Sequence, residues 1–418
     1  MDDERARRRA LGALSLGQVL GGVGIGASLS IGALAAAQVS GSEALSGLAQ
    51  TLLTLGAAAA AIPLARLAVR SGRRPALAAG TAIATAGAVC AFVAIVVGSF
   101  PLLLAAMAML GGGQAVNLQS RFAATDLSRD RTRGRDLSLV VWSTTIGAVL
   151  GPNLGAPGQG ISEALGLPDL AGVYLFPIAA QALACVVYLV LLRPDPLLLA
   201  RARAAERAAG PAAPAAAPRP EAPATVWRFA IVAIALTQAS MVALMSMTPV
   251  HLQHHGASLT VIGLTISLHV AGMYALSPVF GLLTDRLGPL PVVLGAQAIL
   301  AASGLLAAFT PPAGGWAAVA LVLLGLGWSA GTVAGSALLV AAAPAHRRVQ
   351  LQGRSDLVMN LSGAGAGALA GPVLAAIGYE GLGLVLLAPA AVVFAGALLW
   401  GRAGGGSRPS PDRAARAA

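Results

Sequence analysis

The stretch "GAVLGPNLGA", residues 147–156, lies inside a long apolar run, and a similar stretch, "GALAGPVLAA", occupies residues 367–376. Proline removes a hydrogen bond from a helix interior, and each glycine there costs about 1 kcal/mol relative to alanine. Three glycines and a proline in one apolar helix therefore need a structural reason. The recurrence 220 residues later indicates that the chain contains two copies of one unit.

The composition places the chain in a membrane. Of its 418 residues, 57% are hydrophobic and 10% are charged, and the mean hydropathy is +0.79. Apolar runs of 18 or more residues recur, which is typical of multi-span proteins and excludes a soluble fold. Each run can cross a hydrocarbon core of about 30 Å. We expect an all-α membrane protein with twelve spans, at residues 11–38, 44–68, 75–98, 101–125, 137–157, 171–192, 228–250, 260–284, 290–309, 316–341, 356–377 and 381–401.

Arginine placement predicts the topology. All 27 of the lysine and arginine positions are arginine, and nearly all lie in the two termini, the central linker and every second loop. Positive residues concentrate in the cytoplasmic loops of membrane proteins. We therefore expect a protein of the cytoplasmic membrane with both termini in the cytoplasm. An even number of spans follows. The net charge of +11 is spread over short loops, which argues against nucleic-acid binding.

The two halves match in detail. Asp136 precedes Gly147 and the pair Gly151-Pro152 by 11 and 15 residues, and the same offsets separate a second set, Asp356, Gly367 and Gly371-Pro372. Gln18 corresponds to Gln238 at the same period of 220 residues. Six-span repeats of this kind build one large group of secondary transporters. We expect an N-terminal half at 1–192, a cytoplasmic Ala/Pro-rich linker at 193–227, a C-terminal half at 228–401 and a cytoplasmic tail at 402–418.

Two loops carry a family resemblance. The segments "ARLAVRSGRRPAL" (65–77) and "GLLTDRLGPLPVV" (281–293) resemble the G-x-L-x-D-R-x-G-R-R loop of the major facilitator superfamily. The first copy has Ala65 and Val69 where the family has glycine and an acid. The resemblance spans residues 11–401 and implies two six-helix halves that work by alternating access. The retained motif residues are Arg70, Gly72, Arg73 and Arg74 in the first copy, and Gly281, Asp285, Arg286 and Gly288 in the second.

The opening stretch resembles the family's G-x-x-x-G-P-x-x-G-G element in span five, which is associated with proton-driven exporters. Gly147, Gly151 and Gly155 recur at i, i+4 and i+8, so they form a stripe that lets another helix approach closely, while Pro152 bends the helix. In the resembled fold span five packs against span eight of the other half. The stripe is then a rocking surface between halves, and the alternative is that it only packs helices.

Polar side chains inside the spans are candidates for a substrate pathway, because each is costly in a bilayer and faces the bundle interior or a cavity. Their alternative role is an interhelical hydrogen bond without substrate contact. His269 can also carry a coupling proton, or it can be a packing residue. Three histidines at 251, 254 and 255 lack neighbouring acids or cysteines, so no metal site is expected. The pathway candidates are Gln18, Gln114, Asn117, Arg121, Gln238, His269 and Asn360.

Charges in the cytoplasmic loops suggest a latch. In the resembled fold, Arg70 at the end of span two can pair with Asp356 in span eleven, and Arg286 can pair with Asp136. Asp126 is a competing partner for Arg70. These pairs would close the cytoplasmic side while the outside is open, and the alternative is that they are solvated loop charges of little energetic value.

These features predict a secondary transporter that is not an enzyme and has no cofactor. The chain lacks a G-x-x-x-x-G-K-[ST] loop, so direct ATP driving is not expected. The leading hypothesis is proton-coupled efflux of a small amphipathic organic compound, resembling the drug:proton antiporters, by a monomer whose partners are its substrate, a proton or other coupling ion, and lipid. One alternative is uptake or facilitated diffusion of a neutral solute. Another is a membrane enzyme or sensor, for which no catalytic constellation is visible.

Overall fold

A computed structural model describes residues 3–42, 45, 47–209, 223–257, 259–309 and 315–404. The predicted tail from residue 405 and residues 210–222 of the predicted linker lie outside these ranges. The first half contains the helices α1 (Asp3–Ser40), α2 (Gly47–Ser71), α3 (Arg73–Val96), α4 (Phe100–Ala123), α5 (Arg133–Leu150), α6 (Gly155–Leu165) and α7 (Leu175–Leu191). The linker begins with α8 (Pro196–Ala209), and the second half contains α9 (Ala224–His254), α10 (Leu259–Tyr274), α11 (Ser277–Leu287), α12 (Pro289–Phe309), α13 (Trp316–Ala342), α14 (Arg348–Val385) and α15 (Leu387–Gly404).

The described residues contain ten helical segments long and apolar enough to cross a membrane, and α5 with α6 forms an eleventh that is bent by 49°. The last segment, Arg348–Leu399, has 52 residues, which is roughly 80 Å of helix and enough for two crossings. It reverses at Gly378, whose φ of 72° lies in the left-handed region open to glycine. Counting this segment twice gives the twelve crossings that the sequence predicts.

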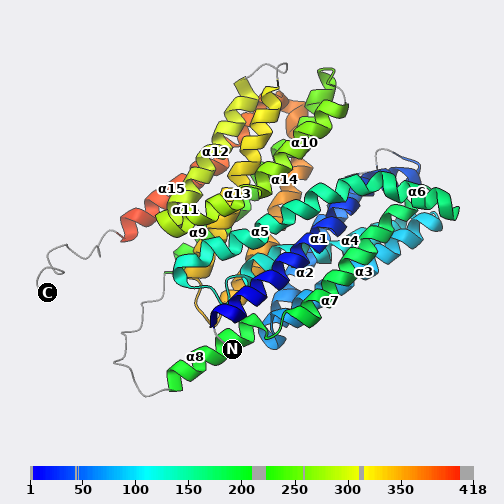
Figure 1. The fold of residues 1–418 in the computed structure, drawn as a ribbon. Helices are drawn as coiled ribbons and strands as arrows, with labels where there is room; N and C mark the ends of the chain where they lie inside the picture. The colour runs from blue at the N-terminus through cyan, green and yellow to red at the C-terminus, as the bar shows by residue number, and fades with distance from the viewer. Residues whose placement is uncertain are drawn as a thin grey trace, which may run out of the picture.

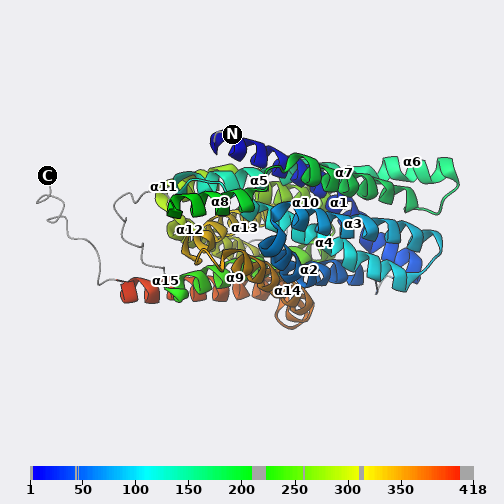
Figure 2. The ribbon, with the colours of Figure 1, turned by 90° about the horizontal axis from the view of Figure 1, so that it is seen from below.

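The helices form two bundles that meet at one end. Figure 1 shows the bundle of α1 to α7 and the bundle of α9 to α15 diverging away from the end at which α1 begins and α15 ends. At that end, where the arginine-rich loops lie, α2 packs against α14 and α5 packs against α11 (Figures 1 and 2). We call this end the arginine-rich end.

The glycine stripe of the opening stretch packs within its own half. A Cβ added to Gly147 would collide with the backbone of Val19 and Val23 on α1, and one added to Gly151 would collide with Gly26 and Ala27. The expectation that this stripe faces the other half is therefore wrong. α5 meets α11 on the side that carries Gly134. Gly147 follows 13 residues later, and over that length an α-helix turns so that the two side-chain directions differ by roughly 220° around the helix axis. The glycine stripe and the surface that meets α11 therefore lie on different sides of the helix.

The second copy behaves in the same way. Gly363 and Gly367 face Gln238 and Val242 on α9, which is the first helix of the second half. A Cβ at Gly371 would meet open space. Gly147 and Gly151 in the first half, and Gly367 in the second, thus bring the fifth crossing close to the first, which explains why two apolar helices tolerate them.

Candidate functional site

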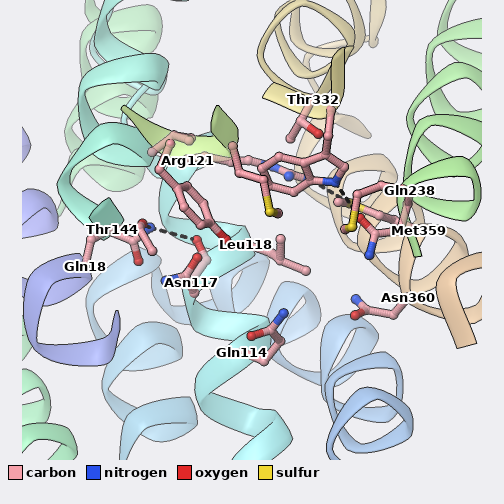
Figure 3. A pocket seen from close by; sticks show the side chains of 15 residues that line it. Gln18, Gln114, Asn117, Leu118, Arg121, Thr144, Gln238, Thr332, Met359 and Asn360 are labelled. Atoms are coloured by element: carbon pink, nitrogen blue, oxygen red, sulfur yellow. Dashed lines mark hydrogen bonds between the residues drawn. The ribbon is translucent and has the colours of Figure 1, made fainter. Parts of the chain in front are cut away.

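A cavity lies between the two bundles, about midway along the long helices (Figure 3). Both halves contribute to its wall, and the wall combines amides, sulfur-containing and aromatic side chains with one arginine. Among the described residues it includes no carboxylate. The lining residues are Gln18, Gln114, Asn117, Leu118, Arg121, Val141, Thr144, Gln238, Met241, Met273, Tyr274, Trp328, Thr332, Met359 and Asn360.

Each half presents one glutamine from its first helix to the cavity. Gln18 on α1 donates through Nε2 to the carbonyl oxygen of Asn117 and to Oγ1 of Thr144, both at 3.2 Å. Gln238 on α9 accepts a hydrogen bond of 2.7 Å from the indole nitrogen of Trp328. Tyr274 meets that indole edge-on, with ring centroids 5.6 Å apart. The wall therefore offers amide hydrogen bonds beside an aromatic surface, which suits a planar or amphipathic solute.

Six of the seven pathway candidates named from the sequence line this cavity. The seventh, His269, does not. It is fully buried on α10, and its Nδ1 lies 2.7 Å from the carbonyl oxygen of Leu321 on α13. Trp328 and Tyr274 were missed because only amides and ionisable side chains were taken as pathway candidates. The chain has five tryptophans and four tyrosines, and this scarcity was a signal that could have found them.

A buried ion pair joins the two halves at the wall of the cavity. Arg121 on α4 contacts Asp356 on α14 with 2.7 Å between Nη2 and Oδ1, and the two side chains are 2% and 0% exposed. The sulfur of Met359 lies 3.6 Å from the same Nη2. Within the described part of the chain, Oδ2 of Asp356 and Nε of Arg121 have no hydrogen-bond partner. The carboxylate thus keeps a free acceptor inside the membrane, where such groups mark ion and proton pathways.

A second buried network closes the arginine-rich end. Arg73 bonds Asp126 with 2.8 Å between Nε and Oδ2, and it donates across the halves to Oε1 of Gln352 at 2.6 Å. Gly353 meets Ala65 so closely that a Cβ on this glycine would overlap the alanine methyl. The predicted pairing of Arg70 with Asp356 or Asp126 is wrong. Arg70 ends α2 on its exposed face, whereas the turn at Gly72, with φ of 96°, directs Arg73 inward.

The second motif copy uses its acid differently from the predicted latch. Asp285 accepts hydrogen bonds from the backbone nitrogens of Gly134 at 2.7 Å and Arg135 at 2.9 Å, so it caps the N-terminus of α5 from the other half. Arg286 is exposed. Asp136 pairs within its own half, with Arg7 and with Ser128, and not with Arg286. The predicted pair of Arg286 with Asp136 is wrong because Arg286 lies on the exposed face of α11 and Asp136 is already bonded within its own half.

The architecture and the two loop motifs agree with comparison of the whole sequence to known families. The profile of the Major Facilitator Superfamily matches residues 14–256 and 229–418. The chain belongs to this superfamily. It is therefore a multi-pass membrane transporter and not an enzyme.

Individual superfamily members are similar over most of the chain. The MFS-type transporter YdeG of Bacillus subtilis (strain 168) is 39% identical over 380 residues, which cover 90% of this chain and 88% of YdeG. The riboflavin transporter RfnT of Brucella anthropi is 29% identical over 388 residues, with 91% and 92% covered. The crystal structure of the human organic anion transporter MFSD10 superposes with a TM-score of 0.74 at 16% identity, covering 93% of this chain and 99% of that one.

Arg70 and Arg73, two of the three motif arginines of the first loop, allow a direct test of the network that closes the arginine-rich end. Replacing Arg73 by methionine leaves Asp126 buried and unpaired, and we expect this to destabilise the closed protein by about 3 kcal/mol. The same change at exposed Arg70 removes the same charge without breaking a buried bond. Thermal unfolding in detergent should show a lower Tm for Arg73→Met than for Arg70→Met. Equal Tm values for the two variants would contradict the assignment of Arg73 as the closing residue.

Proposed function

We propose that this transporter is a proton-coupled exporter of small amphipathic organic compounds, working by alternating access in the manner of the drug:proton antiporters. We further propose that both termini lie in the cytoplasm, so the structure is closed toward the cytoplasm. The observation that carries the proposal is the Arg121–Asp356 pair, which joins the halves at the cavity wall. Asp356 takes the role that the sequence suggests for His269, because Asp356 bonds the cavity-lining Arg121 across the two halves, whereas His269 contacts the backbone carbonyl of Leu321 in its own half.

The ion pair links protonation to the position of the halves. With Asp356 charged, its bond to Arg121 holds α4 against α14 and favours closure of the cytoplasmic end. A proton arriving from the outside neutralises Asp356, removes the attraction and lets that end open. The proton leaves to the cytoplasm, a solute enters the cavity, and the restored pair closes the cytoplasmic end again. In this scheme one proton entering the cell is exchanged for one solute leaving it.

Transport in proteoliposomes tests the proposal. The chain is reconstituted and given a pH gradient, and three fluorescent probes are compared: the cation ethidium, the neutral heterocycle riboflavin and the anion fluorescein. The gradient is made acidic on the side opposite the arginine-rich end. We expect it to drive at least one probe in the direction opposite to proton movement. The variant His269→Ala should retain this movement. Probe movement indifferent to the gradient would contradict proton coupling, and loss of coupling in His269→Ala would return the role to that histidine.

A second candidate function is uptake of a neutral solute, and a specific observation favours it. The described cavity wall has an arginine and amides but no carboxylate, so it suits hydrogen-bond acceptors better than cations. A transporter named for riboflavin, a neutral planar compound, is 29% identical over nearly the whole chain. In this case solute and proton would move together, and riboflavin would enter in the direction of the proton.

Either function predicts a role for the aromatic wall. Replacing Trp328 by alanine removes the indole surface and the donor to Gln238, so we expect binding of a transported planar probe to weaken about tenfold. The matched control is Trp316→Ala, since Trp316 begins the same helix and is 46% exposed. Fluorescence titration of the purified variants measures both affinities. Equal affinities in wild type and Trp328→Ala would exclude this wall from the binding site.

A further inference from the structure

A second cleft, separate from the central cavity, lies at the arginine-rich end between α1 and α5. These helices run side by side (Figure 1), and the cleft between them has a volume of about 470 Å³. Charged residues line the part nearest the loops, and Leu11, Gly12 and Leu139 line the part that extends along the helices. The cleft therefore divides into a charged part and an apolar part.

The charged part combines fixed and available arginines. Arg7 is held by hydrogen bonds to Glu4 at 2.7 Å and to Asp136 at 2.5 Å. Arg8 is bonded to Glu4 through Nε, and 76% of its side chain is exposed. Arg135, across the cleft on α5, is also exposed. Three arginines and two carboxylates line the charged part, so it has an excess of positive charge, and Arg8 and Arg135 are the two exposed arginines among them.

The apolar part is continuous with the surface that faces lipid. A Cβ placed on Gly12 would meet nothing within 4 Å, so α1 leaves open space at this position. Leu139 is 40% exposed, and Trp142 and Ile146 follow on α5 with 38% and 43% exposed. Large apolar side chains exposed on a membrane helix face hydrocarbon. The apolar part of the cleft thus opens sideways into the bilayer, next to the charged part and farther from the loops.

We infer that this cleft binds one anionic phospholipid, with its phosphate on Arg8 and Arg135 and an acyl chain along Gly12 and Leu139. The order of the two parts matches that of a phospholipid, with charge at the level of the loops and hydrocarbon at the level of the apolar helix. The excess of arginine favours an anionic headgroup over a zwitterionic one. A free phosphate would satisfy the arginines but leave the apolar part of the cleft empty.

Native mass spectrometry of the purified full chain tests this inference with defined probes. Phosphatidylglycerol, phosphatidylcholine and inorganic phosphate are added separately, and bound copies are counted. We expect phosphatidylglycerol to bind about tenfold more tightly than phosphatidylcholine, because the choline cation offsets the phosphate charge and is repelled by the excess arginine. The double variant Arg8→Gln/Arg135→Gln should lose this preference. The control Arg9→Gln/Arg131→Gln removes the same charge from exposed arginines that do not line the cleft and should keep it.

A second variant separates a lipid from a free anion. Gly12→Leu fills the apolar part and leaves every charge in place, so we expect it to lower the affinity for phosphatidylglycerol about tenfold. Three results would overturn the inference: equal phosphatidylglycerol binding by wild type and the Arg8/Arg135 variant, an unchanged affinity in Gly12→Leu, or full competition by inorganic phosphate. None of these readouts depends on transport.

Discussion

Asp356→Asn is expected to abolish the effect of a pH gradient on transport. Asparagine keeps the shape of the side chain but cannot release or accept the coupling proton, and it leaves Arg121 buried without its counter-charge. We expect gradient-driven accumulation to fall roughly 100-fold, which corresponds to about 3 kcal/mol, the lower end of the cost of breaking a buried pair. Exchange of labelled for unlabelled solute without a gradient should persist, because it needs only the movement of the halves. The measurement is probe uptake in proteoliposomes under both conditions.

The control for this prediction is Asp130→Asn, which removes an acid whose side chain is 67% exposed at the arginine-rich end. It should leave gradient-driven transport near the wild-type rate. If Asp356→Asn also loses exchange, the combined variant Arg121→Gln/Asp356→Asn, which removes the unpaired charge, should recover exchange but not accumulation. Wild-type accumulation by Asp356→Asn would contradict the assigned role.

Gly281→Leu is expected to hold the arginine-rich end open. A Cβ at Gly281 would overlap Oγ of Ser138 and the carbonyl oxygen of Gly134 on the other half, and a backbone atom cannot turn aside. Overpacking of this kind costs about 2 kcal/mol, which changes a two-state equilibrium roughly 30-fold. Spin labels at Arg70 and Arg354, exposed residues on opposite halves, should report a shift to longer distances by pulsed electron paramagnetic resonance.

The matched control is Gly263→Leu, since a side chain at this exposed helical glycine meets nothing within 4 Å. It should leave the distance distribution of the two labels unchanged. A Gly281→Leu distribution identical to that of the control would mean that the close approach of α5 and α11 does not set the closed state. Closure of the arginine-rich end would then depend on the Arg73 network instead.

The fold could be predicted from this sequence because three independent patterns along the chain indicate the same architecture. Apolar run length predicts each crossing, arginine in every second loop orders the crossings, and the 220-residue period pairs the halves. The cavity could also be predicted in part, since an amide such as Gln18 or Gln238 is rare inside a span and is placed at the bundle interior or in a cavity, where it is not exposed to lipid. The neighbour against which each helix face packs could not be predicted. The stripe at Gly147 faces α1 because α1 carries complementary glycines, and only the assembled helices show this.

Side-chain pairing was the least predictable feature. The sequence places two motif arginines three residues apart, and a resemblance cannot tell which of them points inward. The turn at Gly72, with its positive φ of 96°, decides this, since α2 ends at Ser71 just before it and α3 starts with Arg73 just after it. Arg121 was expected in the pathway, but its partner Asp356 in span eleven was expected to pair with Arg70. The depth of a residue along its helix determines the pair, and span boundaries drawn from hydropathy are too imprecise to give that depth.

The central claim is that solute and proton exchange through Asp356, and proton release on binding tests it most directly. Purified protein in weak buffer is mixed with whichever of the three probes it transports, and a pH indicator reports protons released. We expect release by the wild type and none by Asp356→Asn. Absence of any proton exchange in the wild type, or equal release by both proteins, would contradict it.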